Sequence, residues 1–188
     1  MNESEVTYLL VDGENIDATL GNAILGGVRP TPEQRPRWER VREFSTKLWG
    51  VPCRALFFLN ASSGALPGPF VQALLAMGYR PIPLSGSAEE KVVDLAVLRT
   101  LEALRSRPGN VILASHDHDF TPALTSLIDG KRKIAVLGFR EFVSASYREL
   151  ESRGVEIYDL ESSARAFNVA LPRVRIIPIH EFDPVHFL

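Results

Sequence analysis

Short apolar runs rich in β-branched residues alternate with stretches of helical periodicity, and this alternation limits the fold more than any other feature of the chain. Runs with the length and composition of buried strands occupy residues 6–12, 54–60, 79–84, 111–115, 133–138 and 155–160. The run at 79–84 contains two prolines, which favour an edge strand because proline cannot donate to a central ladder. Helical patterns occupy residues 36–50, 69–78, 89–107, 119–130 and 140–154. The alternation predicts an α/β fold, a three-layer α/β/α sandwich with a mostly parallel sheet.

The length and composition favour one soluble domain with a single substantial core. The chain has 188 residues, of which 45% are hydrophobic and 23% are charged. It contains no apolar run of the roughly 18 residues that cross a bilayer, and its first residues lack the pattern of a signal peptide. The only cysteine, Cys53, is expected to be a buried structural thiol, which suits the reducing cytoplasm. We therefore expect a cytoplasmic protein without a membrane partner.

The net charge of −2 does not indicate a basic nucleic-acid-binding protein. A cluster of acidic residues at one site would, however, mask basic residues elsewhere in the count. Net charge alone therefore leaves a nucleic-acid partner open.

Acidic side chains follow several of the predicted strands. The first strand ends at Asp12, with Asn15 close behind, and "VILAS" runs directly into Asp117 and Asp119. Asp94 lies early in the helix at 89–107, after the weak strand at 79–84. Because the carboxyl ends of parallel strands share one edge of a sheet, we expect these acids to converge.

Four carboxylates cannot share a small cleft unaided. An ionised pair about 4 Å apart costs roughly 4 kcal/mol at an effective dielectric constant near 20. Either some of the acids stay protonated or a cation lies among them. Oxygen ligands favour Mg²⁺ or Mn²⁺, and such an ion suits phosphodiester hydrolysis.

Each acid also has a simpler interpretation. Asp119 suits the N-cap of the helix that follows it, and Asp12 before Gly13 suits a turn. A solvated helix acid is the default for Asp94, although its apolar neighbours Val93 and Leu95 favour burial.

The chain resembles the NYN domains, a branch of the PIN-like nucleases that includes the LabA-like proteins. The resemblance rests on "LLVDGENI" (9–16), "KVVDLAV" (91–97), "ASHDHDFTPAL" (114–124) and "IAVLGF" (134–139), and it covers residues 6 to 160. It implies a PIN-like, Rossmann-like fold and a metal-dependent nuclease, most often acting on RNA. By position, the resemblance implies Mg²⁺ or Mn²⁺ ligands at Asp12, Asp94, Asp117 and Asp119.

The same resemblance implies roles for two polar residues. It implies that Asn15 holds the first aspartate or a bound water, and that Ser115 is the small hydroxyl residue before the Asp-x-Asp pair. The chain departs from the family pattern at His116 and His118, where small residues are usual. These histidines are either extra metal ligands or side chains that point to solvent or pair with the acids.

Candidate substrate contacts lie in a long loop and at the start of a helix. The loop at 26–37 exceeds the family's minimal core and, with the helix after it, carries Arg29, Arg35, Arg37 and Trp38. Arginines beside an aromatic ring suit single-stranded nucleic acid, through phosphate pairing and base stacking. The alternative is that nearby glutamates neutralise the arginines and that Trp38 anchors the helix to the core. Lys91 is assigned to the site, as a phosphate contact or as the partner of an acid.

The last residues depart from this rhythm. We predict a domain at 1–167 and an extension at 168–188, in which "VRII" (174–177) could form a strand. The extension either packs on the domain or binds a partner, and self-association into a homo-oligomer is one alternative.

The acids and the resemblance together predict a metal-dependent nuclease, and the resemblance favours RNA as its substrate. One rival is a Toprim-like phosphotransfer domain, which needs a glutamate where the first strand of this chain ends in Asp12. The other is a PIN-like RNA-binding or scaffolding module without activity.

Overall fold

The computed structural model describes residues 6–173 and 177–188. Its strands form one parallel sheet in the order β3-β2-β1-β4-β5-β6. The strands are β1 (Thr7–Asp12), β2 (Cys53–Asn60), β3 (Tyr79–Leu84), β4 (Asn110–Ala114), β5 (Ile134–Gly138) and β6 (Glu156–Asp159). All six predicted strands are confirmed, and β3, with its prolines, lies at one edge as expected.

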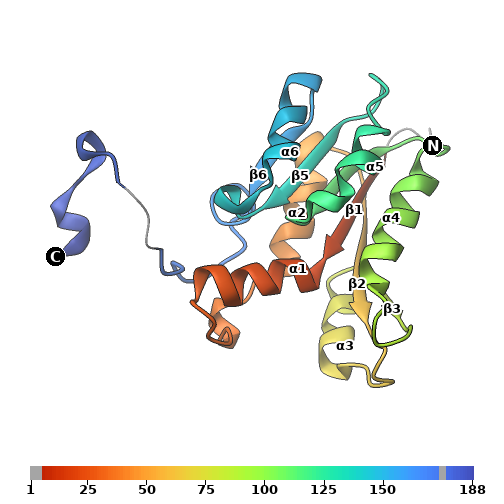
Figure 1. Cartoon of the computed structure of the whole chain (residues 1–188), viewed down its shortest axis with the longest axis horizontal. Coiled ribbons are helices and arrows are strands. Elements are labelled where there is room, and N and C mark those ends of the chain that lie inside the picture. The colour runs from red at the N-terminus through yellow and green to blue at the C-terminus, as the bar shows by residue number, and fades with distance from the viewer. Residues whose placement is uncertain (1–5, 174–176) are drawn as a thin grey trace.

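Helices cover both faces of the sheet, as the predicted three-layer sandwich requires. The α-helices are α1 (Gly13–Ala18), α2 (Trp38–Trp49), α3 (Gly68–Ala76), α4 (Val92–Leu104), α5 (Thr121–Thr125) and α6 (Ala145–Glu149). The shorter π- and 3-10-helical segments are η1 (Thr19–Ile24), η2 (Pro32–Gln34), η3 (His118–Phe120), η4 (Arg140–Phe142), η5 (Leu150–Arg153), η6 (Ile179–Glu181) and η7 (Pro184–Phe187). Figure 1 shows α4 and α5 in front of the strands and α2 behind them.

The two cores follow from the alternation of side chains along the strands. Leu9 and Val11 of β1 pack with α1, α2 and α3, whereas Leu10 packs with α4, α5 and α6 on the other face. Because both faces are covered, the strands read as nearly continuous apolar runs.

Three predicted helices match α2, α3 and α4, and two differ from their prediction. The pattern at 119–130 is the short pair η3 and α5, and the pattern at 140–154 is divided into η4, α6 and η5. The second is interrupted because Ser144 is extended (ψ 143°) and caps α6 by accepting from the Ser146 amide. Asp117, rather than Asp119, caps η3, so the N-cap interpretation of Asp119 is wrong.

The thiol of Cys53 is buried at the start of β2, as expected, and burial raises its pKa to about 11. It is therefore an unreactive core side chain. The cytoplasmic location stays a prediction. Among the described residues, no helix combines the length and the apolar character that crossing a membrane requires.

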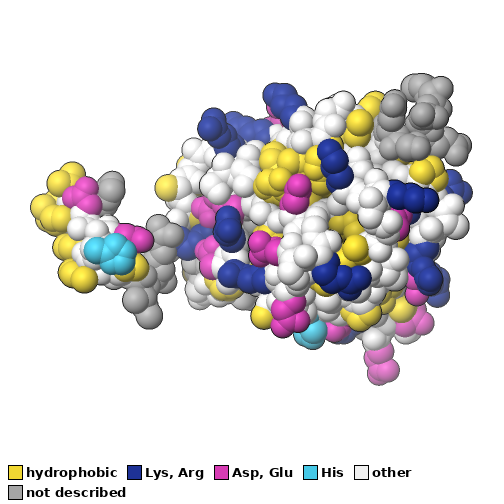
Figure 2. All heavy atoms as spheres, turned by 90° about the horizontal axis from the view of Figure 1, so that it is seen from above, with side chains coloured by type: hydrophobic (Ala, Val, Ile, Leu, Met, Phe, Trp, Pro, Cys, Tyr) yellow, Lys and Arg dark blue, Asp and Glu magenta, His cyan; other side chains and the backbone are white. Residues whose placement is uncertain are grey.

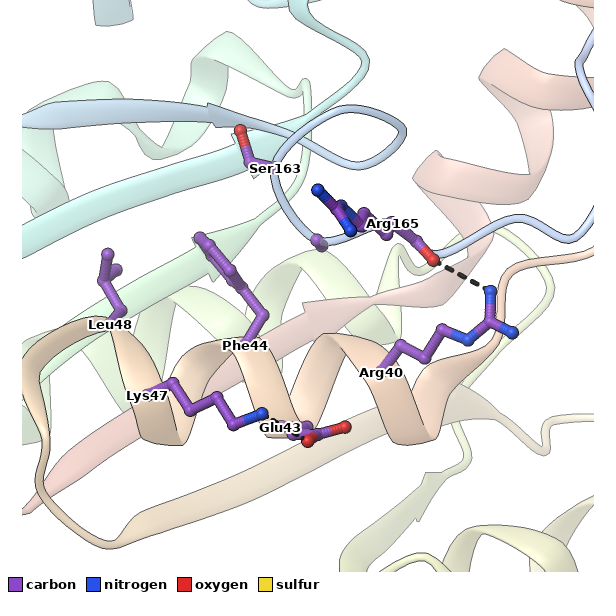
Figure 3. A pocket seen from close by; sticks show the side chains of 8 residues that line it. Arg40, Glu43, Phe44, Lys47, Leu48, Ser163 and Arg165 are labelled. Carbon is purple, nitrogen blue, oxygen red and sulfur yellow. Dashed lines mark hydrogen bonds and ion pairs between the residues drawn. The ribbon is translucent and has the colours of Figure 1, made fainter.

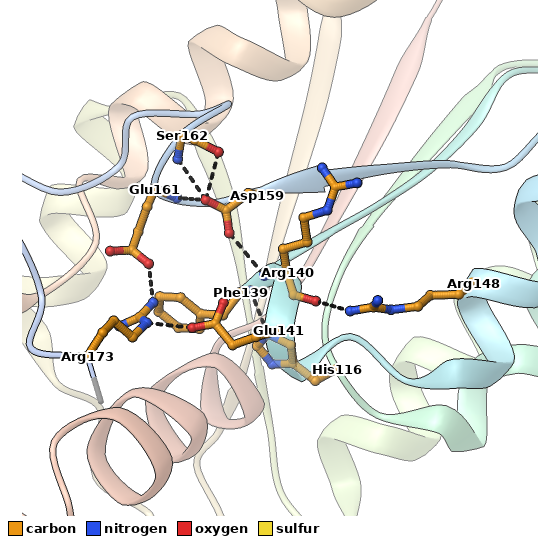
Figure 4. Close-up of polar contacts among 9 residues, drawn as sticks. All are labelled: His116, Phe139, Arg140, Glu141, Arg148, Asp159, Glu161, Ser162 and Arg173. Atoms are coloured by element: carbon orange, nitrogen blue, oxygen red, sulfur yellow. Dashed lines mark hydrogen bonds and ion pairs between the residues drawn. The ribbon is translucent and has the colours of Figure 1, made fainter. Parts of the chain in front are cut away.

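The chain continues to pack on the domain after β6. Leu160, Ala164 and Leu171 are buried in the core that contains α2. Arg173 forms ion pairs with Glu141 and Glu161 (Figure 4). The predicted division after residue 167 remains a prediction, and these contacts favour a boundary after Arg173. Most of the predicted strand at 174–177 lies outside the described residues.

Candidate metal-dependent active site

The order of the strands reverses at β1, and the acidic residues gather there. From β1, the sheet continues through β2 and β3 on one side and through β4, β5 and β6 on the other. In open α/β sheets, ligands bind beyond the carboxyl ends of the strands at such a switch point. Asp12 closes β1, and Asp117 follows the adjacent β4. The fold therefore brings together two segments that are about a hundred residues apart.

Hydrogen bonds fix the carboxylate of Asp12. The hydroxyl of Ser115 donates to Oδ2 of Asp12 over 2.9 Å, and the backbone N–H of Asn15 donates to Oδ1 over 3.4 Å. The Ser115 oxygen also accepts from the backbone N–H of Asp117 over 3.1 Å. Ser115 thus connects the two acids and holds their segments in register.

The electrostatics of Asp12 and Asp94 indicate a shared site. Burial raises the pKa of Asp12 to about 6; the hydrogen bonds from Ser115 and Asn15 oppose this, and the charges of Asp94 and Asp117 add to it. Burial, followed by the charge of Asp117, also raises the pKa of Asp94, against the charge of Lys91. The acids therefore repel one another from separate elements, which is the condition that a bound cation relieves.

The acids at the start of η3 are close enough to share an ion. The candidate ligand atoms of Asp117, His118 and Asp119 all lie within 4.8 Å of one another. Nε2 of His118 lies 3.3 Å from Oδ1 of Asp119. This histidine therefore pairs with an acid, which was one of the interpretations offered for it. Asp12 and Asp94 lie outside this tight group and are coupled to it electrostatically.

His116 differs from both interpretations given for it, because it is buried and neither faces solvent nor can bind an ion. Its Nε2 accepts from the backbone N–H of Phe139 over 2.7 Å (Figure 4), so the ring proton lies on Nδ1. Nδ1 lies 3.0 Å from the amide oxygen of Asn15, to which it donates. Burial lowers the pKa of His116 to about 4, and the ring stays neutral. His116 is a structural link between β4, β5 and α1.

The contacts of Asn15 differ from the expected ones. Its amide oxygen accepts from the backbone N–H of His116 over 2.7 Å, as well as from the ring. Asp12 is held by the backbone of Asn15 and not by its side chain. The amide oxygen of Asn15 is therefore engaged in joining α1 to the end of β4.

Asp159 shows what a purely structural acid looks like at the same edge. It closes β6, and its carboxylate accepts from the backbone of Arg140, Glu161 and Ser162 and from the Ser162 hydroxyl (Figure 4). These donors satisfy the charge, so no ion is needed. The repulsion at Asp12 and Asp94 is thus a property of the switch point and not of every strand end.

Comparison with known proteins agrees with this geometry. The profile of the NYN domain family matches residues 6–157, which is most of the chain. The chain belongs to the NYN domain family. Domains of this family are generally nucleases of the PIN-like type, and they usually use a divalent metal.

A solved structure shares the fold of this NYN domain. It is a protein of unknown function, VPA0982, from Vibrio parahaemolyticus RIMD 2210633, with a TM-score of 0.66 and 18% identity. The match covers 87% of this chain and 97% of that one, and at this identity it supports the fold alone. No curated protein matches the chain.

Two residues that the sequence analysis assigned to the site, Trp38 and Ser115, are buried in the NYN domain. Trp38 is only 6% exposed and packs edge-on against Phe57, with ring centroids 5.0 Å apart, so it cannot stack on a base. It anchors α2 to the core, which was the alternative interpretation. Ser115 is fully buried, and its hydrogen bonds go to Asp12 and Asp117. It positions the acids and does not contact a substrate.

The remaining predicted contacts are divided between the site and the loop at 26–37. Lys91 is exposed before α4 and lowers the pKa of Asp94, which places its charge near the acids. Arg29 and Arg35 are exposed, and Arg35 lowers the pKa of Asp17 on α1. Arg37 is half-buried, and its backbone N–H donates to Ala166.

The start of the loop at 26–37 is held by a backbone hydrogen bond. The backbone N–H of Gly27 donates to the carbonyl of Gly21 over 2.8 Å, so the loop folds back on η1. A side chain at Gly21 would be in ordinary van der Waals contact with Val28 and Pro30. The loop therefore lies beside η1, and Arg35 reaches α1 from there.

Two residues near the site were missed by the sequence analysis. Partial desolvation by neighbouring groups, followed by the charge of Asp94, raises the pKa of Glu14 on the first turn of α1. Its position two residues after Asp12 could have marked it. The hydroxyl of Tyr147 donates to the backbone carbonyl of Asp117 and supports the start of η3. No local sequence pattern marks Tyr147, because the contact joins α6 to another element.

Proposed function

We propose that this NYN domain is a metal-dependent nuclease that hydrolyses phosphodiester bonds, with RNA as its substrate. The observation that carries the proposal is the gathering of Asp12, Asp94, Asp117 and Asp119 at the switch point, with pKa values of Asp12 and Asp94 raised. Unneutralised carboxylates in a cleft disfavour a polyanionic substrate unless a cation is present. The choice of RNA over DNA rests on the family resemblance.

The donor set fits a divalent ion. Asp117 and Asp119 offer hard oxygen ligands within 4.8 Å, and His118 adds an imidazole that Mn²⁺ accepts more readily than Mg²⁺ does. Asp12 and Asp94 would complete the site through water. When bound, such an ion supplies Lewis-acid chemistry at a phosphoryl oxygen and lowers the pKa of a coordinated water.

The protein's own groups hold this arrangement and position a substrate. Ser115 and the Asn15 backbone fix the Asp12 carboxylate, and Tyr147 supports the turn that presents Asp117. Asp119 is exposed and can orient a water molecule or accept its proton. We assign Lys91, whose charge lowers the pKa of Asp94, to contact a substrate phosphate.

Cleavage of end-labelled single-stranded RNA tests the proposal. Wild-type protein is expected to cut it in Mg²⁺ or Mn²⁺ and to stop when EDTA is added, and DNA of the same sequence measures the preference for RNA. Asp12→Asn should lower the rate by about a hundredfold or more, the scale for loss of one electrostatic group in an active site. Glu151→Gln, which removes an exposed acid far from the site, is the control. Binding of RNA without any cleavage would instead identify a silent binding module.

A further inference from the structure

The opposite edge of the sheet carries a group of exposed cations, which we call the basic edge surface. Its residues lie at the amino ends of β2 and β3, after α4, and between α5 and β5: Arg54, Arg80, Arg105, Arg107 and Lys131. In the view from above, lysine and arginine side chains are spread over the face of the domain (Figure 2). The acids lie at the carboxyl ends of the strands, so the two edges of the domain differ in charge.

The basic edge surface is hollowed by two neighbouring cavities. One, of about 510 Å³, is lined by Arg54, Arg80 and Arg107 together with apolar groups such as Leu56 and Leu104. The other, of about 310 Å³, is lined by Arg105, Lys131 and again Arg107. Arg107 lines both cavities, so the two are neighbours on this surface.

The cations of this surface are available for a ligand. Within residues 6–173 and 177–188, none of the five side chains forms an ion pair or a hydrogen bond with the protein. The acid in the smaller cavity, Asp129, is already paired with Arg132 over 3.0 Å. Arg132 in turn donates to the backbone carbonyls of Leu104 and Arg107, which fixes the two loops that carry the free cations.

A third cavity shows the contrast. It lies between α2 and the loop after β6 (Figure 3) and also contains three cations, Arg40, Lys47 and Arg165. There Arg40 donates to the Arg165 carbonyl and to Asn168, and Lys47 is paired with Glu43 over 2.6 Å. Two of its three charges are therefore engaged by the protein.

We propose that the basic edge surface binds the phosphate backbone of single-stranded nucleic acid at a distance from the acidic site. The proposal rests on the proposed nuclease function, because it assigns the surface to the part of a long substrate that lies outside the site. A strand of six residues such as β1 separates the two edges by about 20 Å. A short oligonucleotide in the acidic site cannot reach that far, whereas a long strand can occupy both.

Binding is tested on the full chain carrying Asp12→Asn, in EDTA, by fluorescence anisotropy with labelled single-stranded RNA. Arg105→Glu with Lys131→Glu should weaken binding on the order of tenfold near 0.1 M salt. Loss of two phosphate contacts should also make the decrease of log K with log salt less steep, by about 1.4 in the magnitude of the slope. Lys47→Glu with Arg165→Glu makes the same change in net charge at the third cavity and should have little effect.

Kinetics test the distance between the surface and the acidic site. In the otherwise wild-type chain, Arg105→Glu with Lys131→Glu should raise KM for an RNA of about 30 nucleotides and leave cleavage of a short oligonucleotide unchanged. Equal weakening by the control pair, or unchanged binding of long RNA, would overturn the proposal. The proposal would also be overturned if Arg105→Glu with Lys131→Glu abolished self-association at low salt and left RNA binding unchanged. The surface would then contact the acidic edge of a second copy of the chain. If the wild-type chain cut no RNA in Mg²⁺ or Mn²⁺ while Arg105→Glu with Lys131→Glu still weakened binding, the result would support the surface and refute the nuclease.

Discussion

At the scale of single residues, Asp12 is favourable for binding a cation and unfavourable for stability. It is buried, and its pKa of about 6 lies above the 3.8 of an unperturbed aspartate. Ionisation of such an acid favours the unfolded state, so the stability that the protonated form provides is lost as the pH rises from about 4 to about 6. The proposed function, which needs Asp12 ionised at neutral pH, and stability are thus opposed at this position.

We expect Asp12→Asn to raise the free energy of unfolding at pH 8 in EDTA. The gain should approach the order of 2–3 kcal/mol, from a shift of about two pKa units at 1.36 kcal/mol each, and should vanish near pH 4, where the wild-type acid is protonated. Urea unfolding at both pH values measures it. A variant less stable than wild type at pH 8 would contradict the burial argument.

The hydrogen bond from Ser115 lowers the pKa of Asp12, so its removal should have the opposite effect. In Ser115→Ala, the pKa of Asp12 should rise further above 6. If cleavage requires ionised Asp12, protonation removes the active form at a higher pH in this variant than in wild type. The acidic limb of the pH–rate profile should therefore move to higher pH. Ser126→Ala, at an exposed serine after α5, is the control. An unmoved limb with a lower rate would mean that Ser115 acts on position alone.

At the scale of secondary-structure elements, the strands could be predicted and the breaks in the helices could not. Each strand is a local apolar run, and burial on both faces makes such runs conspicuous. The division of 140–154 depends on the extended backbone at Ser144, which apolar periodicity does not record. The helix α1 was also missed.

The residues of the candidate site also divide into those that the sequence could predict and those that it could not. Asp12, Asp117 and Asp119 could be placed together because the ends of parallel strands share one edge. The role of His116 could not be predicted, because its partner is the backbone N–H of Phe139, directly after β5. Trp38 looked like a nucleic-acid contact because local sequence does not reveal which face of α2 is buried.

The two histidines beside the acids should respond in opposite ways to alanine substitution. His116→Ala leaves the backbone N–H of Phe139 buried without a partner and should lower the free energy of unfolding by about 1–3 kcal/mol. His118 is exposed, so His118→Ala should leave stability within about 0.5 kcal/mol of wild type. Only the second should weaken Mn²⁺ binding, measured by the rise in Tm with added Mn²⁺. If both variants lost the same Mn²⁺ affinity, the assignment of the ion to His118 and its neighbouring acids would be wrong.

At the scale of the whole molecule, a net charge of −2 conceals a division of charge between two edges. The acidic residues gather where the strands end, and unpaired arginines gather where β2 and β3 begin. A residue count adds the two sets and loses the separation, whereas the parallel topology keeps them about one strand length apart. Under the two proposals above, one edge would hold a polyanion while the other holds a cation.

The end of the packed body is a second property that only the whole molecule shows. Arg173 pairs with Glu141 and Glu161 and lies 5.5 Å from the centre of the Phe139 ring, and Leu171 is buried below it. Beyond it, the described residues 177–188 project from the domain (Figure 1), and Ile179 and Val185 are largely exposed. The tail therefore contributes little to the core.

A chain that ends at residue 173 should unfold within about 0.5 kcal/mol of the full-length chain, because the side chains described beyond that point, at 177–185, 187 and 188, are exposed. A chain that ends at residue 167 loses the burial of Leu171 and leaves Glu141 and Glu161 without Arg173, which should cost about 2–5 kcal/mol. Both are measured by urea unfolding. If the two truncations were equally stable, the domain would end after residue 167, as the sequence predicted. If the longer one lost as much as the shorter one, the tail would be part of the fold. Because Arg173 reaches the ring that stacks on His116, the shorter chain should also cut RNA more slowly.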